Sequence, residues 1–179
     1  MKKRLKKIIT ILFLSMLLFN CSDDESHSYD FSGVPNYFYK FTVTGQSNQD
    51  MLNPQNVDGY NFDEMKLYYV KNGHPIEVYE NNLTFPRNIN LSSFWFIEEG
   101  KENREVFYLT ATLFGVKGEA GIQTTIIEWN DKKKDSINLD YKLDDSNSNY
   151  LSKIYVNNEL YWEMESGHLV DKLIQIVHD

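Results

Sequence analysis

The chain has 179 residues, of which 25% are charged and 41% hydrophobic, with 4 Pro, 9 Gly and 1 Cys. This composition excludes a collagen, a coiled coil and a disulfide scaffold. The first 20 residues hold five of the 18 Lys and Arg and no acid, which leaves 13 cations against 26 acids, a formal charge of −13, in the rest of the chain. Such a charge repels phosphate backbones, so nucleic acid is not expected as a partner.

The N-terminal segment has the pattern of an export signal. Cations at its start are followed by the apolar run 8–19, which is 12 residues long and is interrupted only by Thr10 and Ser15. A membrane-spanning helix needs about 20 residues, whereas the apolar region of a secretory signal runs about 7 to 15. We therefore interpret residues 1–20 as a signal peptide.

The only cysteine, Cys21, directly follows this run in the sequence Leu18-Phe19-Asn20-Cys21. Leu18 and Cys21 resemble the lipobox of bacterial lipoproteins, although Asn20 stands where Gly, Ala or Ser is usual. The resemblance implies cleavage before Cys21 and lipid attachment to its thiol, and several acyl chains anchor a protein stably. The alternatives are an ordinary secretory signal and a buried free thiol.

Four polar residues follow the cysteine, in the order Ser22-Asp23-Asp24-Glu25. They resemble the surface-export signal of lipoproteins from Bacteroidota-type bacteria, which implies an outer-membrane protein displayed on the cell surface; the periplasmic face is the alternative location. An acidic solvated spacer is the other interpretation of these residues. We interpret residues 21–35 as a lipidated, flexible stalk.

Period-two alternation dominates from residue 36, beginning with apolar or aromatic residues at every second position of 37–43. The segment 65–79 predicts a hairpin, because Asn72-Gly73 supplies the positive φ angles of a type I′ turn. Its register pairs Val70 with Pro75 and places Leu67, Tyr69, Ile76 and Val78 on one buried face. Because Pro75 lacks an N–H, its arm is expected to begin at a sheet edge.

Further strands are predicted at 89–98, 105–114, 122–129, 135–142, 151–156 and 159–163, and the ambiguous tail 166–179 favours a last strand over a helix. The polar pair Asn157-Asn158 is expected to form the turn between two of these strands. Short strands without intervening helical periods predict an all-β, antiparallel β-sandwich (Ig-like or related) that occupies residues 36–179 as a single domain, and an open barrel is the alternative.

No catalytic residue, metal site or cofactor is predicted. The chain has four histidines, His27, His74, His168 and His178, and their spacing is not that of a metal site. The chain also lacks a nucleophile elbow and a phosphate-binding glycine loop. A pair of carboxylates for glycan hydrolysis stays an alternative, since two acids across a cleft suffice. A calcium loop at Asp145, Asn147 and Asn149 is a further alternative, although Tyr150 stands where Gly is needed and Val156 where the bidentate Glu is expected.

Aromatic residues are the more suggestive feature. The hairpin register places Tyr68 and Tyr79 opposite the buried face, and the consecutive Phe94, Trp95 and Phe96 must put an aromatic on each side of their strand. If exposed, these five residues could stack on sugar rings or on a partner protein. The alternative is that a second sheet or loop covers them.

Several short patches in the body are similar to segments of small Bacteroidota lipoproteins: 50–54, 63–69, 127–130 and 158–163. The resemblance implies a lipid-anchored β domain and assigns no activity. Asp135-Ser136-Ile137 also resembles the O-glycosylation acceptor of such bacteria, which implies a surface position for Ser136; a chance match is the alternative.

Together these features predict a non-enzymatic surface lipoprotein that is held to the membrane by its N-terminal lipid and binds a glycan, a peptide or an envelope protein. A glycan-active hydrolase and a purely structural envelope component are the alternatives. Opposed carboxylates across an aromatic cleft would favour the hydrolase, and a flat or convex aromatic face would favour binding.

Overall fold

The computed structural model describes residues 38–81, 84–97, 103–113, 115, 119–164 and 173–178. Every described residue belongs to one compact unit, which spans Ser32–Asp179. The predicted signal peptide, Cys21 and the acidic cluster 22–25 lie outside the described residues.

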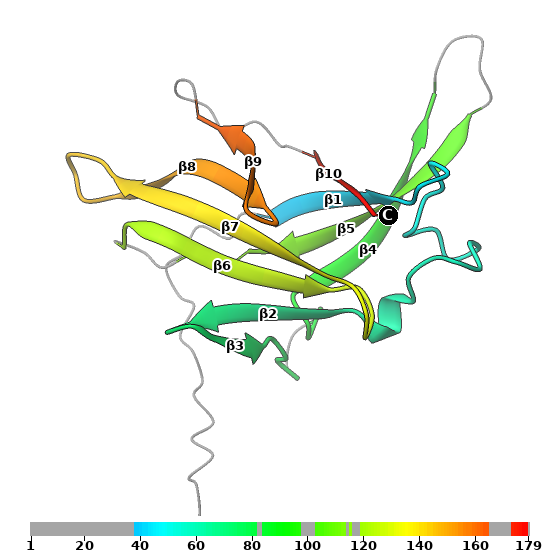
Figure 1. Ribbon diagram of the computed structural model, residues 1–179, viewed down its shortest axis with the longest axis horizontal. Coiled ribbons are helices and arrows are strands. Elements are labelled where there is room, and N and C mark those ends of the chain that lie inside the picture. Colours follow the sequence, from blue (N-terminus) through cyan, green and yellow to red (C-terminus); the bar gives the residue numbers. More distant parts are fainter. Residues whose placement is uncertain are drawn as a thin grey trace, which may run out of the picture. The chain divides into compact units, whose positions relative to one another are not determined.

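Ten strands and one short 3-10 helix make up the described part of the chain: β1 (Phe38–Thr44), η1 (Phe62–Glu64), β2 (Lys66–Lys71), β3 (His74–Glu77), β4 (Ile89–Phe96), β5 (Arg104–Thr112), β6 (Gly121–Glu128), β7 (Lys134–Leu143), β8 (Asn149–Val156), β9 (Glu159–Glu163) and β10 (Leu173–Val177). Sheet A has the order β10-β1-β5-β4, and sheet B has the order β3-β2-β6-β7-β8-β9 (Figure 1). The predicted all-β sandwich is confirmed. Its antiparallel pattern has one exception, since β10 lies parallel to β1.

The core lies between the two sheets and is built from the alternating apolar positions of their strands. Phe41, Leu109 and Ile174 supply it from sheet A, while Leu67, Ile127 and other residues supply it from sheet B. Trp129, directly after β6, is the largest fully buried side chain among the described residues. The period of two in the sequence therefore marks the faces that are buried.

Both predicted two-residue turns are present. Asn72 and Gly73 have φ angles of 52° and 79°, and Asn157 and Asn158 have φ angles of 51° and 69°. The β2–β3 register pairs Val70 with Pro75, as predicted, and β3 is an edge strand of sheet B. Left-handed backbone is tolerated by Gly and Asn, which is why these dipeptides end one strand and begin the next.

The distal ends of β4 and β5 extend past the rest of sheet A as an arm, which we define as residues 93–97 and 103–107 (Figure 1). On the core-facing side of β4, the exposed fraction rises from 3% at Ile89 to 63% at Trp95. The two strands stay paired to Phe96 and Arg104. The core therefore ends before the arm does.

Asp50 fixes the base of the arm. Its Oδ2 accepts a hydrogen bond from the Phe107 N–H over 2.9 Å, and its Oδ1 accepts one from the Leu52 N–H over 2.9 Å. Thr44, the last residue of β1, forms an isolated bridge with Asp50. Where β1 ends, a carboxylate thus replaces the missing strand as hydrogen-bond acceptor for β5.

Tyrosine hydroxyls connect the two sheets. Tyr69 of β2 donates to the Thr112 carbonyl of β5 over 2.9 Å. Tyr161 of β9 donates to the Leu173 carbonyl and accepts from the Gln175 N–H, both over 3.1 Å. The Tyr161 hydroxyl therefore satisfies two backbone groups on the unpaired edge of β10, an edge that otherwise invites pairing with another chain.

Candidate functional site

Sheet A presents one face to the core and one away from it. Residues that pair across neighbouring strands share a face, and the register of β1, β4, β5 and β10 assigns sixteen residues to the face turned away from the core. We call this set the outer face of sheet A: Phe38, Lys40, Thr42, Thr44, Asn90, Ser92, Phe94, Phe96, Arg104, Val106, Tyr108, Thr110, Thr112, Leu173, Gln175 and Val177.

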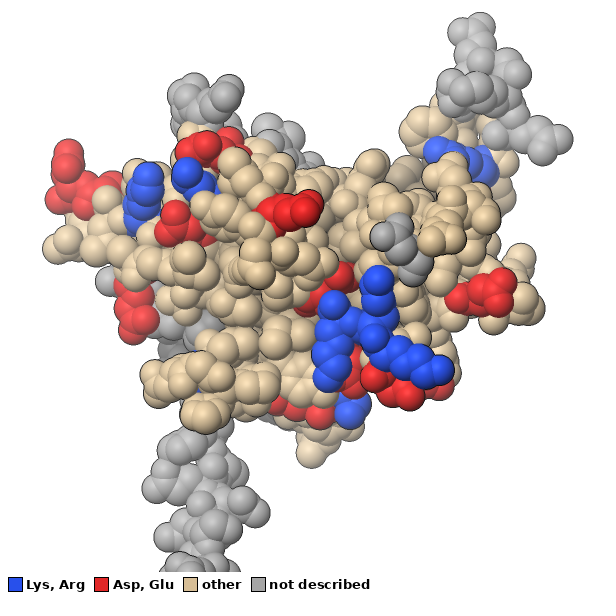
Figure 2. Space-filling view, viewed as in Figure 1, with Lys and Arg blue, Asp and Glu red and all other residues tan. Residues whose placement is uncertain are grey.

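The charge on this face is opposite to that of the chain. Its strand positions include the cations Lys40 and Arg104 and no Asp or Glu, although the chain carries a formal net charge of −8. The remaining positions are apolar, or carry hydroxyl and amide groups. In Figure 2 the arm, at the upper right, shows basic atoms among uncharged ones.

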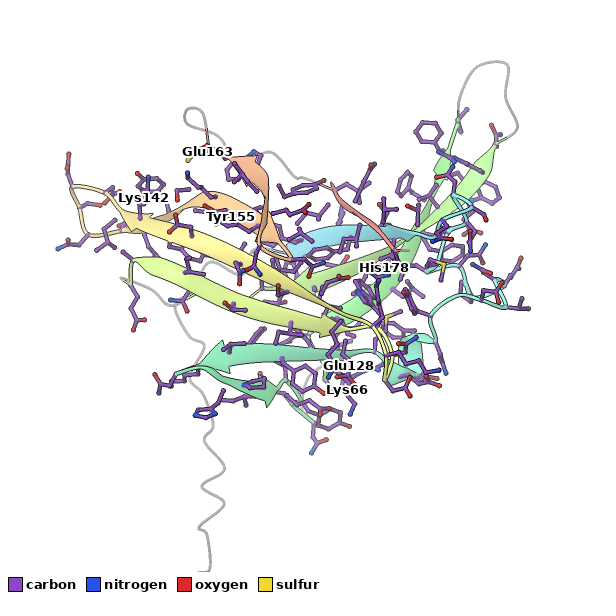
Figure 3. The ribbon with its side chains drawn as sticks, in the orientation of Figure 1. Lys66, Glu128, Lys142, Tyr155, Glu163 and His178 are labelled. Carbon is purple, nitrogen blue, oxygen red and sulfur yellow. The ribbon has the colours of Figure 1, made fainter. Side chains whose placement is uncertain are left out.

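An aromatic row runs along the outer face from the middle of β5 to the arm. The ring centroids of Tyr108 and Phe94 lie 5.8 Å apart, and Phe96 stands two residues beyond Phe94 on the same side of β4. Phe94 and Phe96 are 39% and 41% exposed. Aromatic side chains project from the arm at the upper right of Figure 3. A ligand lying along the sheet would meet these rings in sequence.

A cation stands at each end of the row. Lys40 Nζ lies 5.5 Å from the centroid of the Tyr108 ring, and the Arg104 guanidinium carbon lies 5.2 Å from that of Phe96. Such contacts attract the cation to the ring face and restrict its position. The row is thus Lys40, Tyr108, Phe94, Phe96, Arg104.

The other side of the arm has a different character. Trp95 and Ile97 are exposed there, and Trp95 pairs with Glu105. The Glu105 carboxylate accepts a hydrogen bond from the Ser93 hydroxyl over 2.6 Å. Of the three consecutive aromatics singled out in the sequence, two therefore lie on the outer face and Trp95 lies opposite.

Tyr68 lies in β2 of sheet B, Tyr79 lies just after β3, and neither joins the row. Tyr68 is half-buried in β2, and Lys134 Nζ lies 5.7 Å from its ring centroid. Burial, followed by the charge of Glu128 and a hydrogen bond to it, raises the pKa of Tyr68 to about 12. Lys66 and Glu128, which pair across β2 and β6, lie side by side in Figure 3. Tyr79 is exposed beyond β3.

A buried polar network forms a second candidate site. His178, directly after β10, lies 2.7 Å through Nε2 from Asp135 Oδ2 and 2.5 Å through Nδ1 from the Tyr60 hydroxyl. Asp135 also accepts from the Trp129 indole N–H, at 2.5 Å, and from the Asn157 amide, at 2.7 Å. With a proton on Nε2, His178 donates to Asp135.

This arrangement has the order of a catalytic triad, with a tyrosine as the terminal hydroxyl. Its electrostatics oppose nucleophilic chemistry, because burial and then the charge of Asp135 raise the pKa of Tyr60 and so disfavour the phenolate. Asp135 and His178 are both buried. The network therefore acts as a structural connection between β7 and the segment that follows β10.

Among the described residues, no cluster of three or more His, Cys, Asp or Glu side chains is placed to hold a metal ion. In the turn considered for calcium, Asp144 Oδ1 accepts from the Ser146 N–H, the Ser146 hydroxyl and the Ser148 N–H. No helix within the described ranges is long and apolar enough to span a membrane.

Ser136 lies half-buried in β7, where its backbone N–H donates to the Asn157 side chain and its carbonyl accepts from the Asn157 N–H. Its glycosylation stays a prediction.

Sequence reasoning did not single out Lys40, Arg104, Tyr108, or the Asp135–His178 pair. Side chains alternate between the two faces of β5, which places Arg104 and Tyr108 on one face. This part of the site could therefore have been predicted from the sequence. The register of β4 against β5 was needed to join them to Phe94 and Phe96, and no two-residue turn marks that register. The contact between Asp135 and His178 spans 43 positions and has no local signature.

Comparison with protein-family models, with curated proteins and with solved structures finds no match.

Proposed function

We propose that this chain is a non-enzymatic, lipid-anchored glycan-binding module of the outer-membrane surface, and that the outer face of sheet A is its binding site. The observation that carries the proposal is the row Tyr108, Phe94 and Phe96 on the outer face of sheet A, in which Phe94 and Phe96 are exposed and Tyr108 is partly accessible. Aromatic rings offer sugar rings a large apolar surface to stack on at low entropic cost.

Hydrogen-bonding groups beside the row support a glycan over an apolar ligand. Asn90, Ser92 and Thr110 lie next to Tyr108 on the same face, and all three are partly accessible. Hydroxyl and amide groups can both donate and accept hydrogen bonds, which suits the hydroxyl groups of sugars. The rings of the outer face therefore suit the apolar faces of a sugar, and its short polar groups suit the sugar hydroxyls.

The absence of carboxylates at the strand positions of this face favours binding over hydrolysis. Glycosidases use two carboxyl groups that flank the scissile bond. Glu105, the acid nearest the row in sequence, lies on the opposite side of the arm, with Ser93 and Trp95. A pair of carboxylates facing a sugar on the outer face is thus not available from the described strands.

The anchor in this proposal rests on the sequence alone. The cationic start, the short apolar run and the position of Cys21 favour lipidation at the mature N-terminus. The acidic residues 22–25 favour export to the cell surface, and the periplasmic face stays the alternative.

A glycan array tests the proposal with the full chain in detergent. We expect retained glycans, and we expect Phe94→Ala and Phe96→Ala to weaken retention by roughly tenfold each, on the scale of one aromatic stacking contact. Tyr79→Ala is the matched control, because it removes an exposed aromatic that lies just after β3, away from sheet A. Failure to retain any glycan, or equal losses in the control, would contradict the proposal.

A further inference from the structure

We propose that the ligand of the outer face of sheet A is an anionic glycan, whose carboxylate or sulfate groups pair with Lys40 and Arg104. This inference rests on the proposed glycan-binding function and adds the charge class of the ligand.

The first support is the charge separation between this face and the rest of the chain. The sixteen strand positions of the face carry two cations and no acid, whereas acids outnumber cations by 26 to 18 over the whole sequence. In an acidic protein, a face free of acids is the surface on which an anion meets the least repulsion. Complementary charge of this kind raises association rates and specificity.

The second support is the surroundings of the two cations, which lie beside aromatic rings. No acidic partner faces them at the neighbouring strand positions, since Lys40 pairs with Thr110 and Leu173, and Arg104 pairs with Phe96. Elsewhere in the described part of the chain, three lysines form ion pairs with acids: Lys66 with Glu77, Lys134 with Glu128 and Lys153 with Glu163. The cations of the outer face are instead positioned by aromatic rings.

The third support is the placement of the cations at the two ends of the aromatic row. A glycan stacked on Tyr108, Phe94 and Phe96 would bring its charged substituents to Lys40 at one end and Arg104 at the other. Both cations already lie over rings, so little side-chain freedom is lost on binding. Arg104 can also bind a carboxylate or a sulfate through two parallel hydrogen bonds.

A nucleic acid would use the same charges but does not fit the face as well. Nucleic-acid binding draws most of its affinity from several phosphate contacts, and two cations in a chain with an acidic excess supply few. The sugar-compatible hydroxyl and amide groups of Asn90, Ser92 and Thr110 favour the anionic glycan.

Matched pairs of polymers test the charge class with the full chain in detergent. Polygalacturonate is compared with its methyl ester, and dextran sulfate with dextran, so that each pair shares a backbone and differs in charge. We expect the protein to retain the charged member of at least one pair at least fivefold more strongly, and to lose this preference as salt rises. The two pairs distinguish a carboxylate from a sulfate ligand.

Variants then locate the charge contact. Lys40→Gln and Arg104→Gln should each weaken retention of the charged polymer by about fivefold, whereas Lys132→Gln, an equal charge change in the exposed β6–β7 loop, should leave it unchanged. Lys40→Arg should keep binding, and unfolding curves of all variants check that each is folded.

Two results would overturn the inference without overturning the proposed function: equal retention of the neutral polymers, or neutral-glycan binding that Lys40→Gln and Arg104→Gln leave unchanged. Equal weakening by Lys132→Gln would show a nonspecific charge effect and would also overturn it. Retention of single-stranded DNA above every glycan would reject the glycan class. If no glycan is retained and Phe94→Ala has no effect, both proposals fail.

Discussion

His178 Nε2 lies 2.7 Å from Asp135 Oδ2, which joins the end of the chain's last strand to a buried position in β7 of the other sheet. Asp135 accepts hydrogen bonds from His178, Trp129 and Asn157 at once. One carboxylate thus satisfies donors from three separate parts of the sequence. We expect it to be a main determinant of stability.

Replacing Asp135 with Ala should lower the free energy of unfolding by about 3 kcal/mol or more, because three buried donors lose their acceptor. Asp131→Ala removes the same charge from an exposed loop position and should change stability by less than about 0.5 kcal/mol. Urea unfolding followed by tryptophan fluorescence measures both. Equal effects of the two substitutions would show that the network contributes nothing specific.

The same carboxylate predicts a loss of stability in acid. Burial raises the pKa of Asp135, but the hydrogen bonds from His178, Asn157 and Trp129 and the charge of His178 together outweigh burial and leave the pKa below its ordinary value of 3.8. The unfolded state then binds the proton more readily than the folded state, so the contribution of Asp135 is complete above that value and is lost as pH falls toward the folded pKa.

Unfolding measured between about pH 5 and pH 2 tests this linkage. The wild-type protein should lose stability steeply as the pH falls, and Asp135→Asn should flatten that part of the curve, since the amide does not titrate. An unchanged slope in the variant would assign the acid sensitivity to other groups.

The β8–β9 turn offers a matched pair of substitutions. Both Asn157 and Asn158 have positive φ angles, which glycine adopts without strain. Asn157→Gly removes two side-chain hydrogen bonds, to the Ser136 N–H and to Asp135, and should cost about 1 to 3 kcal/mol.

Asn158→Gly removes only an exposed contact of 3.2 Å with Asn138 and should change stability by at most about 0.5 kcal/mol. Thermal unfolding compares the two variants. If Asn158→Gly proved the more damaging, the turn's contribution would come from its backbone and not from the bonds of Asn157.

Cys21→Ser tests the predicted anchor. If the thiol carries the lipid, the variant should move from the membrane fraction to the soluble fraction, because the largely apolar run of 12 residues at 8–19 is too short to hold the chain by itself. Fractionation followed by immunoblotting measures the shift, and Ser22→Ala is the control that should leave the protein in the membrane. Persistent membrane association of Cys21→Ser would reject the tether.

The aromatic arm shows how far sequence patterns reach. The run Phe94-Trp95-Phe96 predicted rings on both sides of one strand, and the structure places two on the outer face and one opposite. The sequence does not decide whether those rings are covered, because coverage depends on where the second sheet ends. The exposure of Trp95 follows from that end point.

The sequence by itself determined the local features: the strands, from their period of two; the turns at Asn72-Gly73 and Asn157-Asn158, from the left-handed backbone that these residues tolerate; and the edge position of β3, from Pro75. Each depends on residues within a few positions of one another. Only the tertiary structure decided that β10 lies parallel to β1, that His178 reaches Asp135, and that Lys40 and Arg104 lie at the two ends of one aromatic row. These relationships arise because burial of apolar faces brings together strands that are distant along the chain, and the energy that selects their neighbours is spread over the whole core.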